Sequence, residues 1–314
     1  MEAVKRQLDA ILAAAELPEP LAAQASAVLA KAYATYERTP HWPVVELPRR
    51  LLAALGGPAA LGDGLAAAAL LFYAAADVID DAQDDELAAN PAWRGWSWQE
   101  AVNCGNLLLF LSQRTFLTLK APQRVRLEWG RRFAEVGVRM AAGQCRDLYA
   151  TADAPYDEAG VLRVAEEKVG AYWGAIAALA PVWAGRKDVE AWHTLGCRIG
   201  VLYQVATDVW AYMTPEPHQD VALGKLTLPL AFARMIDPGL PALWASGPLD
   251  AEAQAAARAR VAATGAVTYG GLRVEILRKE AHDSLMALDC PEAEKLLLPL
   301  IEGVSLQAPI SASA

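Results

Sequence analysis

The segment from Gly64 to Glu86, GLAAAALLFYAAADVIDDAQDDE, constrains the fold more than any other part of this chain. It is nearly uncharged at its start and ends in six acidic residues. A continuous, Ala-rich apolar run without Gly or Pro after Gly64 predicts a buried helix rather than a strand. We therefore expect a cluster of carboxylates where a core helix ends.

Four of these acids share one helix face, because Asp77, Asp80, Asp81 and Asp84 fall at offsets of 0, 3, 4 and 7. Like charges at these spacings repel, and carboxylates near a helix C-terminus oppose the macrodipole, each by roughly 0.3 to 1 kcal/mol. A bound cation would resolve both conflicts. Oxygen ligands without His or Cys suit Mg²⁺, which binds through one or two carboxylates plus substrate phosphates. The alternative is a solvated acidic helix end.

Composition narrows the class of protein. Hydrophobic residues make up 54% of the chain and charged residues 21%, with ten Trp, which fits a large helical core. The net charge of -9 argues against nucleic-acid binding and against attraction to anionic membranes. An anionic substrate would therefore need a local basic patch or metal ions.

The cysteines and the N-terminus bear on location. The four cysteines are far apart and form no CxxC pair, so we expect neither a zinc site nor disulfides, and a reduced cytoplasmic setting. The N-terminal sequence lacks the features of a signal peptide. We also expect no transmembrane segment, because the run 65–79 is short and interrupted by Asp77, and the run 170–185 is broken by Pro181.

Helical periodicity recurs along most of the chain between breaks rich in Pro and Gly. This pattern predicts an all-α bundle of about ten to twelve helices around a central cavity. We expect one domain over residues 1–307 and a disordered tail over 308–314. The expected breaks are 18–20, 40–43, 56–64, 88–95, 152–155, 214–218 and 237–247.

A second candidate helix, residues 194–213, carries polar groups within an apolar sequence. Gln204, Asp208 and Tyr212 follow one another at four-residue offsets and should project together. Buried polar groups need partners, so they either bond one another or face a polar cavity.

Two lysines are candidates for binding an anion. Lys225 follows Gly224 in a tight connection that could present an ammonium group, a good partner for phosphate. Lys168 comes just before an apolar helix, where the alternative is an ordinary salt bridge on a helix face. Gln144 and Asp147 share a helix face at a spacing of three. Each feature alone is compatible with a purely structural role.

The order of these motifs is more specific than any one of them, and the chain resembles the trans-isoprenyl diphosphate synthases, or polyprenyl synthetase family, of the class I terpenoid synthase fold. The resemblance spans roughly residues 65–233. The matching residues are DDxxD at Asp80–Asp84, a remnant of RRG at Trp93–Gly95, GNLLL at Gly105–Leu109, GQxxDL at Gly143–Leu148, Lys168, YQ at Tyr203 and Gln204, and DxxxGKxTLP at Asp220–Pro229.

The resemblance implies a helical bundle around a deep apolar cavity, with two acid-bearing helices facing each other across its mouth. Mg²⁺ held by Asp80 and Asp84, with Asp81 in support, would bridge an allylic prenyl diphosphate, and Lys168 and Lys225 would add positive charge. A homodimer is implied by analogy, and a heteromer is the alternative. The residues that the resemblance assigns to substrate binding are Arg94, Gln144, Asp147, Gln204 and Asp208, with Asp208 also a metal ligand.

The chain departs from the family pattern at three places. The second DDxxD falls on residues 207–211, where Thr207 stands at the first position and only Asp208 remains. The GGKRxRP segment that contributes to binding isopentenyl diphosphate is missing around residues 38–50, although Arg49 and Arg50 could substitute. Trp93 replaces the first Arg of RRG, so only Arg94 remains to bind a diphosphate.

These losses affect the acceptor side more than the allylic side and leave three interpretations. The chain could be an unusual chain-elongating synthase. It could ionise an allylic diphosphate without using isopentenyl diphosphate, as a terpene cyclase or a prenyltransferase to another acceptor. It could also be a catalytically weak or regulatory subunit of a heteromeric synthase.

In the family, bulky residues just before the first DDxxD close the cavity and limit chain length. Here small residues, Ala75 and Ala76, occupy these positions. By analogy the pocket has room for a chain of about C15 to C20 or longer, unless Phe72 or Tyr73 closes it further down.

Overall fold

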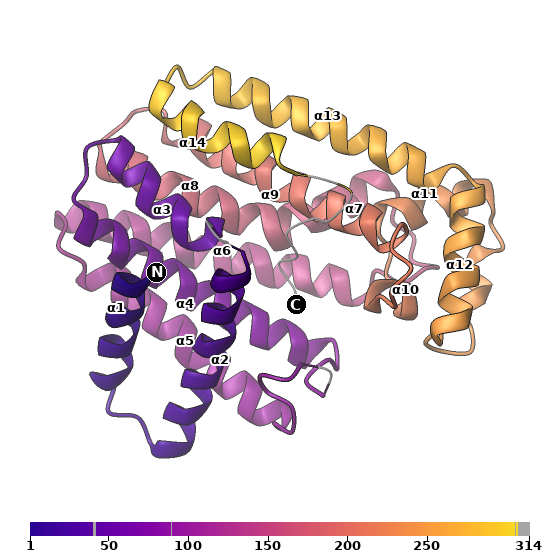
Figure 1. Cartoon of the computed structure of the whole chain (residues 1–314), viewed down its shortest axis with the longest axis horizontal. Coiled ribbons are helices and arrows are strands. Elements are labelled where there is room, and N and C mark those ends of the chain that lie inside the picture. The colour runs from indigo at the N-terminus through magenta and orange to yellow at the C-terminus, as the bar shows by residue number, and fades with distance from the viewer. Residues whose placement is uncertain (40–41, 89, 305, 307–314) are drawn as a thin grey trace. The chain divides into compact units, whose positions relative to one another are not determined.

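The computed structural model describes the whole chain except residues 40, 41, 89, 305 and 307–314 (Figure 1). The described residues form fourteen α-helices, one π-helical turn and one 3₁₀ helix, and their only bridge of β type joins Thr151 to Lys225. The prediction of an all-α fold is confirmed. The helix count exceeds ten to twelve because helices as short as the five-residue α10 (Gln219–Leu223) carry too few residues to show a period.

The chain forms two compact units, one of Met1–Val136 with Ala175–His193 and one of Gly137–Gly174 with the chain from Thr194 onward. The single domain expected over residues 1–307 stays a prediction. The expected tail, 308–314, lies outside the described residues. The chain passes between the units within α6 (Gln123–Leu148), α8 (Ala171–Trp183) and α9 (Val189–Ala211).

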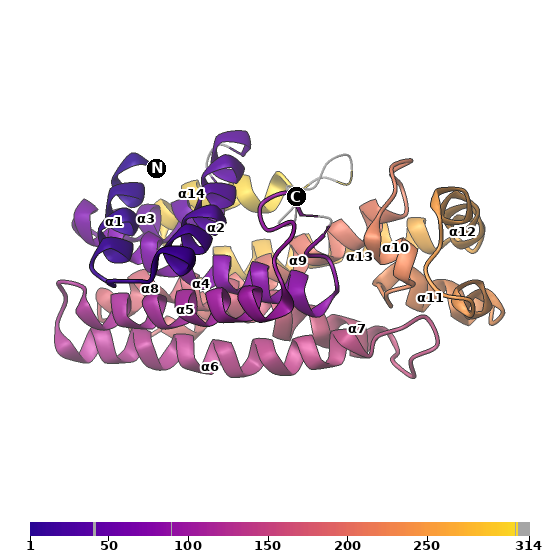
Figure 2. The ribbon, with the colours of Figure 1, turned by 90° about the horizontal axis from the view of Figure 1, so that it is seen from below.

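The first unit is built around α4 (Ala59–Gln83), the helix predicted from the opening segment. It begins directly after Pro58, so the expected break at 56–64 is wrong from residue 59 onward, and almost every residue from Leu61 to Ala75 is buried. Figure 2 shows α5 alongside α4, and α1, α2 and α3 also pack on α4. The bounds are α1 (Glu2–Ala13), α2 (Glu19–Arg38), α3 (Pro43–Ala54) and α5 (Trp98–Thr118).

Helix α4 corrects the expectation about membrane spans. With 25 residues it is long and apolar enough to cross a membrane, longer than the interrupted run 65–79 suggested. However, 78% of its most apolar window is buried within the protein, as in the core helix of a globular unit.

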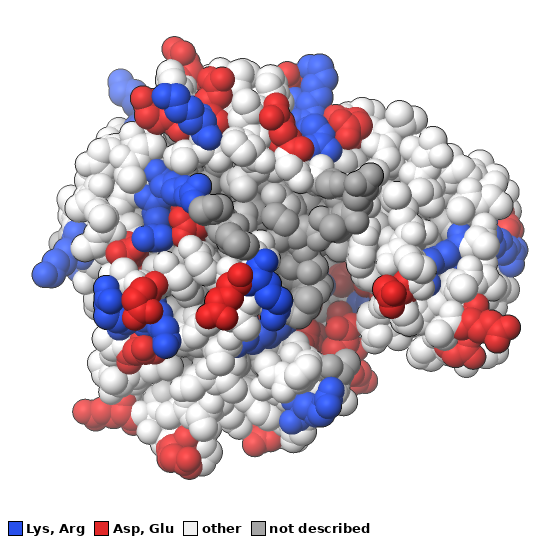
Figure 3. All heavy atoms as spheres, in the orientation of Figure 1, with Lys and Arg blue, Asp and Glu red and all other residues white. Residues whose placement is uncertain are grey.

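In the second unit, α13 lies along α14 and also packs against α11 and α12 (Figure 1). A π-helical turn, η1 (Glu166–Gly170), joins α7 to α8. On the face shown in Figure 3, acidic and basic side chains are interspersed. The remaining bounds are α7 (Glu158–Ala165), α11 (Leu228–Ile236), η2 (Leu240–Trp244), α12 (Ala251–Ala263), α13 (Ala266–Met286) and α14 (Pro291–Glu302).

Candidate active site

Backbone hydrogen bonds cap the acidic C-terminal end of α4. The amide of Asp84 donates to the carbonyl of Asp80, and the amide of Glu86 donates to the carbonyl of Asp81 at 2.7 Å. Between them Asp85 has a φ of 61°, the left-handed conformation of a Schellman motif, which Asp tolerates. The carboxylates therefore crowd the last turn, where they oppose the helix dipole as the sequence predicts.

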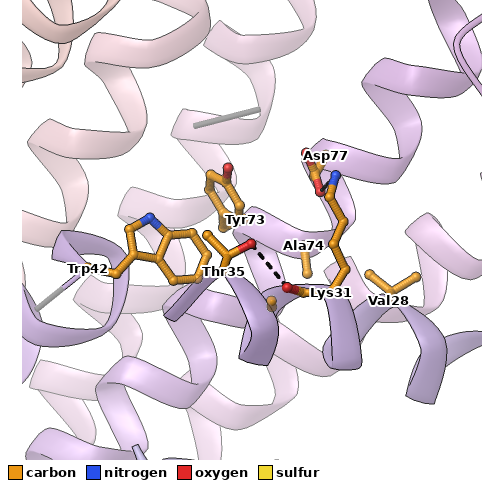
Figure 4. A pocket seen from close by; sticks show the side chains of 8 residues that line it. Val28, Lys31, Thr35, Trp42, Tyr73, Ala74 and Asp77 are labelled. Carbon is orange, nitrogen blue, oxygen red and sulfur yellow. Dashed lines mark hydrogen bonds and ion pairs between the residues drawn. The ribbon is translucent and has the colours of Figure 1, made fainter. Parts of the chain in front are cut away.

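Asp77 is neutralised from another helix. The Nζ atom of Lys31 on α2 lies 2.8 Å from Asp77 Oδ2, with only 12% and 14% of the two side chains exposed. Burial raises the pKa of Asp77 to about 6, with Asp80 and Asp81 adding to the rise and Lys31 opposing it. Figure 4 shows the Lys31 side chain extended toward Asp77.

Asp81 is held by the loop that follows α4. Its Oδ2 accepts hydrogen bonds from Asn90 Nδ2 and from Trp93 Nε1, each at 2.8 Å. Trp93 is completely buried, and Lys31 Nζ lies 4.3 Å from the centroid of its ring. Sequence reasoning missed Lys31 and Asn90, and it treated Trp93 only as a lost arginine.

Asp80 and Asp84 are half-buried and one helical turn apart. Among the described residues no group of three or more His, Cys, Asp or Glu is arranged to hold a metal ion. Two carboxylates on one face fit a Mg²⁺ ion that takes its other ligands from phosphate and water, and they do not fit an all-protein cage. The predicted metal set of Asp80, Asp84 and Asp208 is divided between the two units.

The second unit brings both candidate lysines to one carboxylate. Asp147 Oδ2 lies 2.8 Å from Lys168 Nζ and 3.4 Å from Lys225 Nζ, and all three side chains are largely buried. Burial acts to raise the pKa of Asp147, but the two ammonium groups outweigh it and lower that pKa below its ordinary value. Lys168 thus makes a long-range pair with Asp147 and is not only part of a helix-face salt bridge.

Two glycines make this cluster possible. A Cβ atom on Gly143 of α6 would lie 2.7 Å from the backbone nitrogen of Lys168, so only glycine lets α6 approach the π-helical turn. Gly224 ends α10 with a φ of 65°, and the next residue, Lys225, forms the bridge to Thr151. π-Helical turns are frequent at functional sites, and here one carries Lys168.

Gln144 lies on the same face of α6 as Asp147, as predicted. It is 9% exposed, and neither its Nε2 nor its Oε1 has a hydrogen-bond partner among the described residues. An unpaired buried amide is costly, so it points to a ligand or water at this place.

On α9, two of the three polar residues bond each other, and the buried hydroxyl of Tyr212 does not join them. Gln204 Nε2 donates to Asp208 Oδ1 at 2.8 Å. Burial and the nearby Asp220 raise the pKa of Asp208 to about 7, while the bond from Gln204 acts in the opposite direction. Thr207, at the lost first position of the second motif, donates its hydroxyl to the carbonyl of Tyr203 in its own helix.

The arginines expected to compensate for the missing GGKRxRP segment are engaged elsewhere. Arg49 donates to Asp63 at 2.7 Å and to Glu46 at 2.8 Å, and Arg50 donates to Glu46 at 3.0 Å. Arg94 is exposed, and its Nε donates to the carbonyl of Ala88 at 3.2 Å.

A small pocket lies among residues of α2, the start of α3 and α4. It has a volume of about 10 Å³, room for roughly one water molecule, and its walls include Lys31, Trp42, Tyr73 and Asp77 (Figure 4). Trp42, at the start of α3, packs edge-on against Tyr73 with ring centroids 5.1 Å apart. The pocket is too small for a diphosphate.

The two alanines before the DDxxD motif have different surroundings. Ala75 is fully buried, whereas Ala76 is half-buried and lies on the same side of α4 as Tyr73 and Asp80. Phe72 packs edge-on against Phe133. Of the two alanines, Ala76 is therefore the one that lies on the same helix face as Asp80, one turn before it.

Comparisons with known proteins agree with the predicted family. The family model described as polyprenyl synthetase matches residues 54–239, more than half of the chain. Comparison with curated proteins gave no match.

Solved structures share the fold over nearly the whole chain. A polyprenyl synthetase from Streptomyces coelicolor A3(2) is 17% identical with a TM-score of 0.80, covering 96% of each chain. A geranylgeranyl pyrophosphate synthetase from the archaeon Geoglobus acetivorans is 20% identical with a TM-score of 0.78, covering 96% of this chain and 97% of its own. A polyprenyl synthase from Caulobacter crescentus CB15, complexed with calcium and isoprenyl diphosphate, is 18% identical with a TM-score of 0.77, covering 96% and 94%. The chain has the all-α isoprenoid synthase fold and belongs to the polyprenyl synthetase family.

Proposed function

We propose that this protein is a Mg²⁺-dependent prenyltransferase that ionises an allylic prenyl diphosphate and releases pyrophosphate. The observation that carries the proposal is the cluster in which Lys168 and Lys225 meet at the carboxylate of Asp147 beside the amide of Gln144, which has no hydrogen-bond partner among the described residues. Two ammonium groups that converge on one place can both donate hydrogen bonds to a phosphate group, for which Lys is a good partner. A calcium and isoprenyl diphosphate complex of a protein with the same fold supports this choice of ligand.

The chemistry needs stabilisation of a leaving group. When the allylic carbon–oxygen bond breaks, its electron pair moves to the diphosphate oxygen and leaves an allylic carbocation. Lys168 and Lys225 would donate hydrogen bonds to the diphosphate as its negative charge grows. Asp80 and Asp84 would hold Mg²⁺, which supplies Lewis-acid stabilisation of the same group, with Asp208 as a further ligand in its ionised form. The cation would then be captured by an acceptor, which loses a proton.

Isopentenyl diphosphate is the acceptor that the family favours, because the structurally similar proteins include geranylgeranyl pyrophosphate synthases. One observation favours a second candidate, prenyl transfer to an acceptor without a diphosphate. Arg49 and Arg50 are paired with Glu46 and Asp63, and the pocket lined by Lys31, Trp42 and Asp77 has room for about one water molecule. Cyclisation has no support from the family or the similar structures.

The test is turnover with defined substrates. The protein is incubated with Mg²⁺ and dimethylallyl, geranyl, farnesyl or geranylgeranyl diphosphate, each with and without isopentenyl diphosphate. Pyrophosphate and organic products are measured. Longer prenyl diphosphates support elongation, and pyrophosphate release that requires another added acceptor supports the second candidate. Absence of turnover with every substrate, alone or with a copurified partner, contradicts the proposal. The interpretation as a regulatory subunit would then remain.

We also propose that the protein forms a homodimer in the cytoplasm. On the first unit, Phe110 and Leu117 of α5 are 74% and 44% exposed, and Leu127 of α6 is 55% exposed. Exposed large apolar side chains of this kind mark association surfaces. The four cysteines are all free, which fits a reducing compartment.

A further inference from the structure

The π-helical turn η1, which carries Lys168, lies against one face of α6. The residues of α6 that contact the turn follow one another at intervals of about one helical turn. They are Arg139, Gly143 and the neighbouring pair Arg146 and Asp147. The turn is therefore held along α6 and not only where Lys168 meets Asp147.

The backbone of this turn needs support from its surroundings. The amide of Ala171 donates to the carbonyl of Glu166, five residues earlier, where an α-helix would use the residue four earlier. Such π-helical bonds are rare, and they insert one extra residue into the helix. The inserted residue changes the direction of the preceding side chains relative to those of α8. The place of Lys168 thus depends on the π-helical hydrogen bonding of the turn.

Glu167, directly before Lys168, uses both of its carboxylate oxygens to bind arginines from two helices. Its Oε2 pairs with Nη1 of Arg146 on α6, and its Oε1 accepts from Nε of Arg163 on α7 at 3.0 Å. Only 13% of the Glu167 side chain is exposed. Charge-assisted bonds to a partly buried carboxylate are stronger than those of an exposed ion pair. Glu167 therefore ties the turn to α6 and to α7.

The two ion pairs beside each other on α6 and the turn have opposite polarity. Arg146 meets Glu167, and the next residue of α6, Asp147, meets the next residue of the turn, Lys168. A shift of the turn by one residue in one direction would bring Arg146 to Lys168. A shift in the other direction would bring Asp147 to Glu167. Like charges repel, so both shifts are unfavourable.

We propose that Glu167, through Arg146 and Arg163, is a positioning residue that holds the π-helical turn in place and thereby keeps Lys168 at Asp147. Glu167 does so without contacting the substrate itself. That the positioned Lys168 then acts on a diphosphate rests on the proposed function.

The first test is Glu167→Gln, which removes the charge at nearly constant size. Hydrogen exchange of the backbone amides over residues 166–171 is measured by mass spectrometry without any ligand. Exchange should become about tenfold faster, because the turn opens more often. Arg146→Met should give most of this increase and Arg163→Met less, since Arg146 comes from α6 and is 34% exposed against 63% for Arg163.

Glu166→Gln is the matched control. Glu166 is the neighbouring acid of the same turn, but its pair with Arg139 is exposed, by 52% and 42% of the two side chains. An exposed pair contributes little, so the exchange of residues 166–171 should stay at the wild-type rate. Wild-type exchange in Glu167→Gln, or an equal increase in Glu166→Gln, overturns the role of Glu167.

A double-mutant cycle tests whether the turn keeps Lys168 at Asp147. Asp147→Asn weakens the pairing with Lys168 and lowers stability in urea unfolding at pH 7. If Glu167→Gln has already displaced Lys168, Asp147→Asn has less to remove, and the loss that it causes should be at least about twofold smaller in that background. An unchanged loss overturns the positioning of Lys168.

Pyrophosphate release separates this proposal from the proposed function. Glu167→Gln should lower kcat about tenfold with a smaller change in KM, because Lys168 acts most on the charge that grows on the leaving group. Glu166→Gln should keep the wild-type kcat. If the wild type releases no pyrophosphate while the exchange and the cycle behave as expected, the proposed function fails and the positioning stands. Wild-type kcat and KM in Glu167→Gln overturn the positioning.

Discussion

The two charged regions of this molecule bind their buried carboxylates in opposite ways. At the end of α4, a single lysine, Lys31, is paired with Asp77 in a run that contains five further acids. In the second unit, two lysines meet at the carboxylate of Asp147. The first region gathers carboxylates and suits a cation, whereas the second brings two ammonium groups to one place, where both could donate to an anion. Release of a diphosphate with the help of Mg²⁺ requires both.

The largest effect on the rate is expected from the two lysines proposed to bind the diphosphate. Lys168→Ala or Lys225→Ala should lower the rate of pyrophosphate release by about 100-fold, because each removes a charged donor to the leaving group. The rate is measured with a coupled pyrophosphate assay at saturating allylic diphosphate. Lys187→Ala, at an exposed lysine, is the control and should retain the wild-type rate. Normal rates in both lysine variants would show that the two lysines have only a structural role.

The charge of the Asp147 carboxylate can also be tested through the stability of the fold. Its pKa is lowered in the folded state, so its ionised form stabilises the fold above the unfolded-state value of about 3.9, and this stability is lost as pH falls through the folded pKa. Asp147→Asn should therefore lower the free energy of unfolding at pH 7 by about 1 to 3 kcal/mol and by a smaller amount near pH 3. Urea unfolding at both values measures this.

Asp9→Asn, at an exposed acid on α1, is the control and should change little at either pH. A loss of stability that is equal at pH 7 and pH 3 in Asp147→Asn would mean that the lysines do not depend on the charge of this carboxylate.

Much of the acid-bearing helix could be predicted from the sequence, because a long Ala-rich run ending in acids has few alternatives. The pairings could not be predicted. Lys31 stands alone in an ordinary amphipathic helix, and nothing in its neighbours indicates a partner 46 residues later. Asn90 and Trp93 lie in a loop whose path depends on tertiary packing.

In the second unit, the GQxxDL and GKxTLP patterns indicated residues that the structure brings together at Asp147, and they indicated the shared face of Gln144 and Asp147. They could not show that the two lysines meet at Asp147, because that depends on a π-helical turn and on the close approach of Gly143. The Gln204–Asp208 bond was one of two alternatives that spacing alone left undecided.

A moderate effect is expected at Ala76, where the family resemblance implies a cavity for the prenyl chain. Ala76→Phe places a ring on the face of α4 that carries Tyr73 and Asp80, so the accepted or produced prenyl chain should shorten by one or more isoprene units, about five carbons each. Chain length is measured by liquid chromatography and mass spectrometry of the products. Unchanged product length in an active variant would contradict this position of the cavity.

The smallest effect on chemistry is expected at the exposed apolar residues of the first unit. Phe110→Asp should shift the protein from dimer to monomer in sedimentation experiments, because it places a charge in an apolar contact. Exchange of the exposed Thr118 for Asp, at the end of the same helix, is the control. A wild-type protein that is monomeric in this experiment would contradict the proposed homodimer.

The central claim is that Asp80 helps to hold the metal that assists diphosphate release. Its most direct test is Mg²⁺-dependent pyrophosphate release from farnesyl diphosphate, with acceptor present, by the wild type, Asp80→Asn and Asp85→Asn, the last changing an exposed acid in the same run. We predict release by the wild type that stops when EDTA removes Mg²⁺, a loss of at least about 100-fold in Asp80→Asn, and nearly normal release in Asp85→Asn. Equal rates in Asp80→Asn and the wild type would contradict the account.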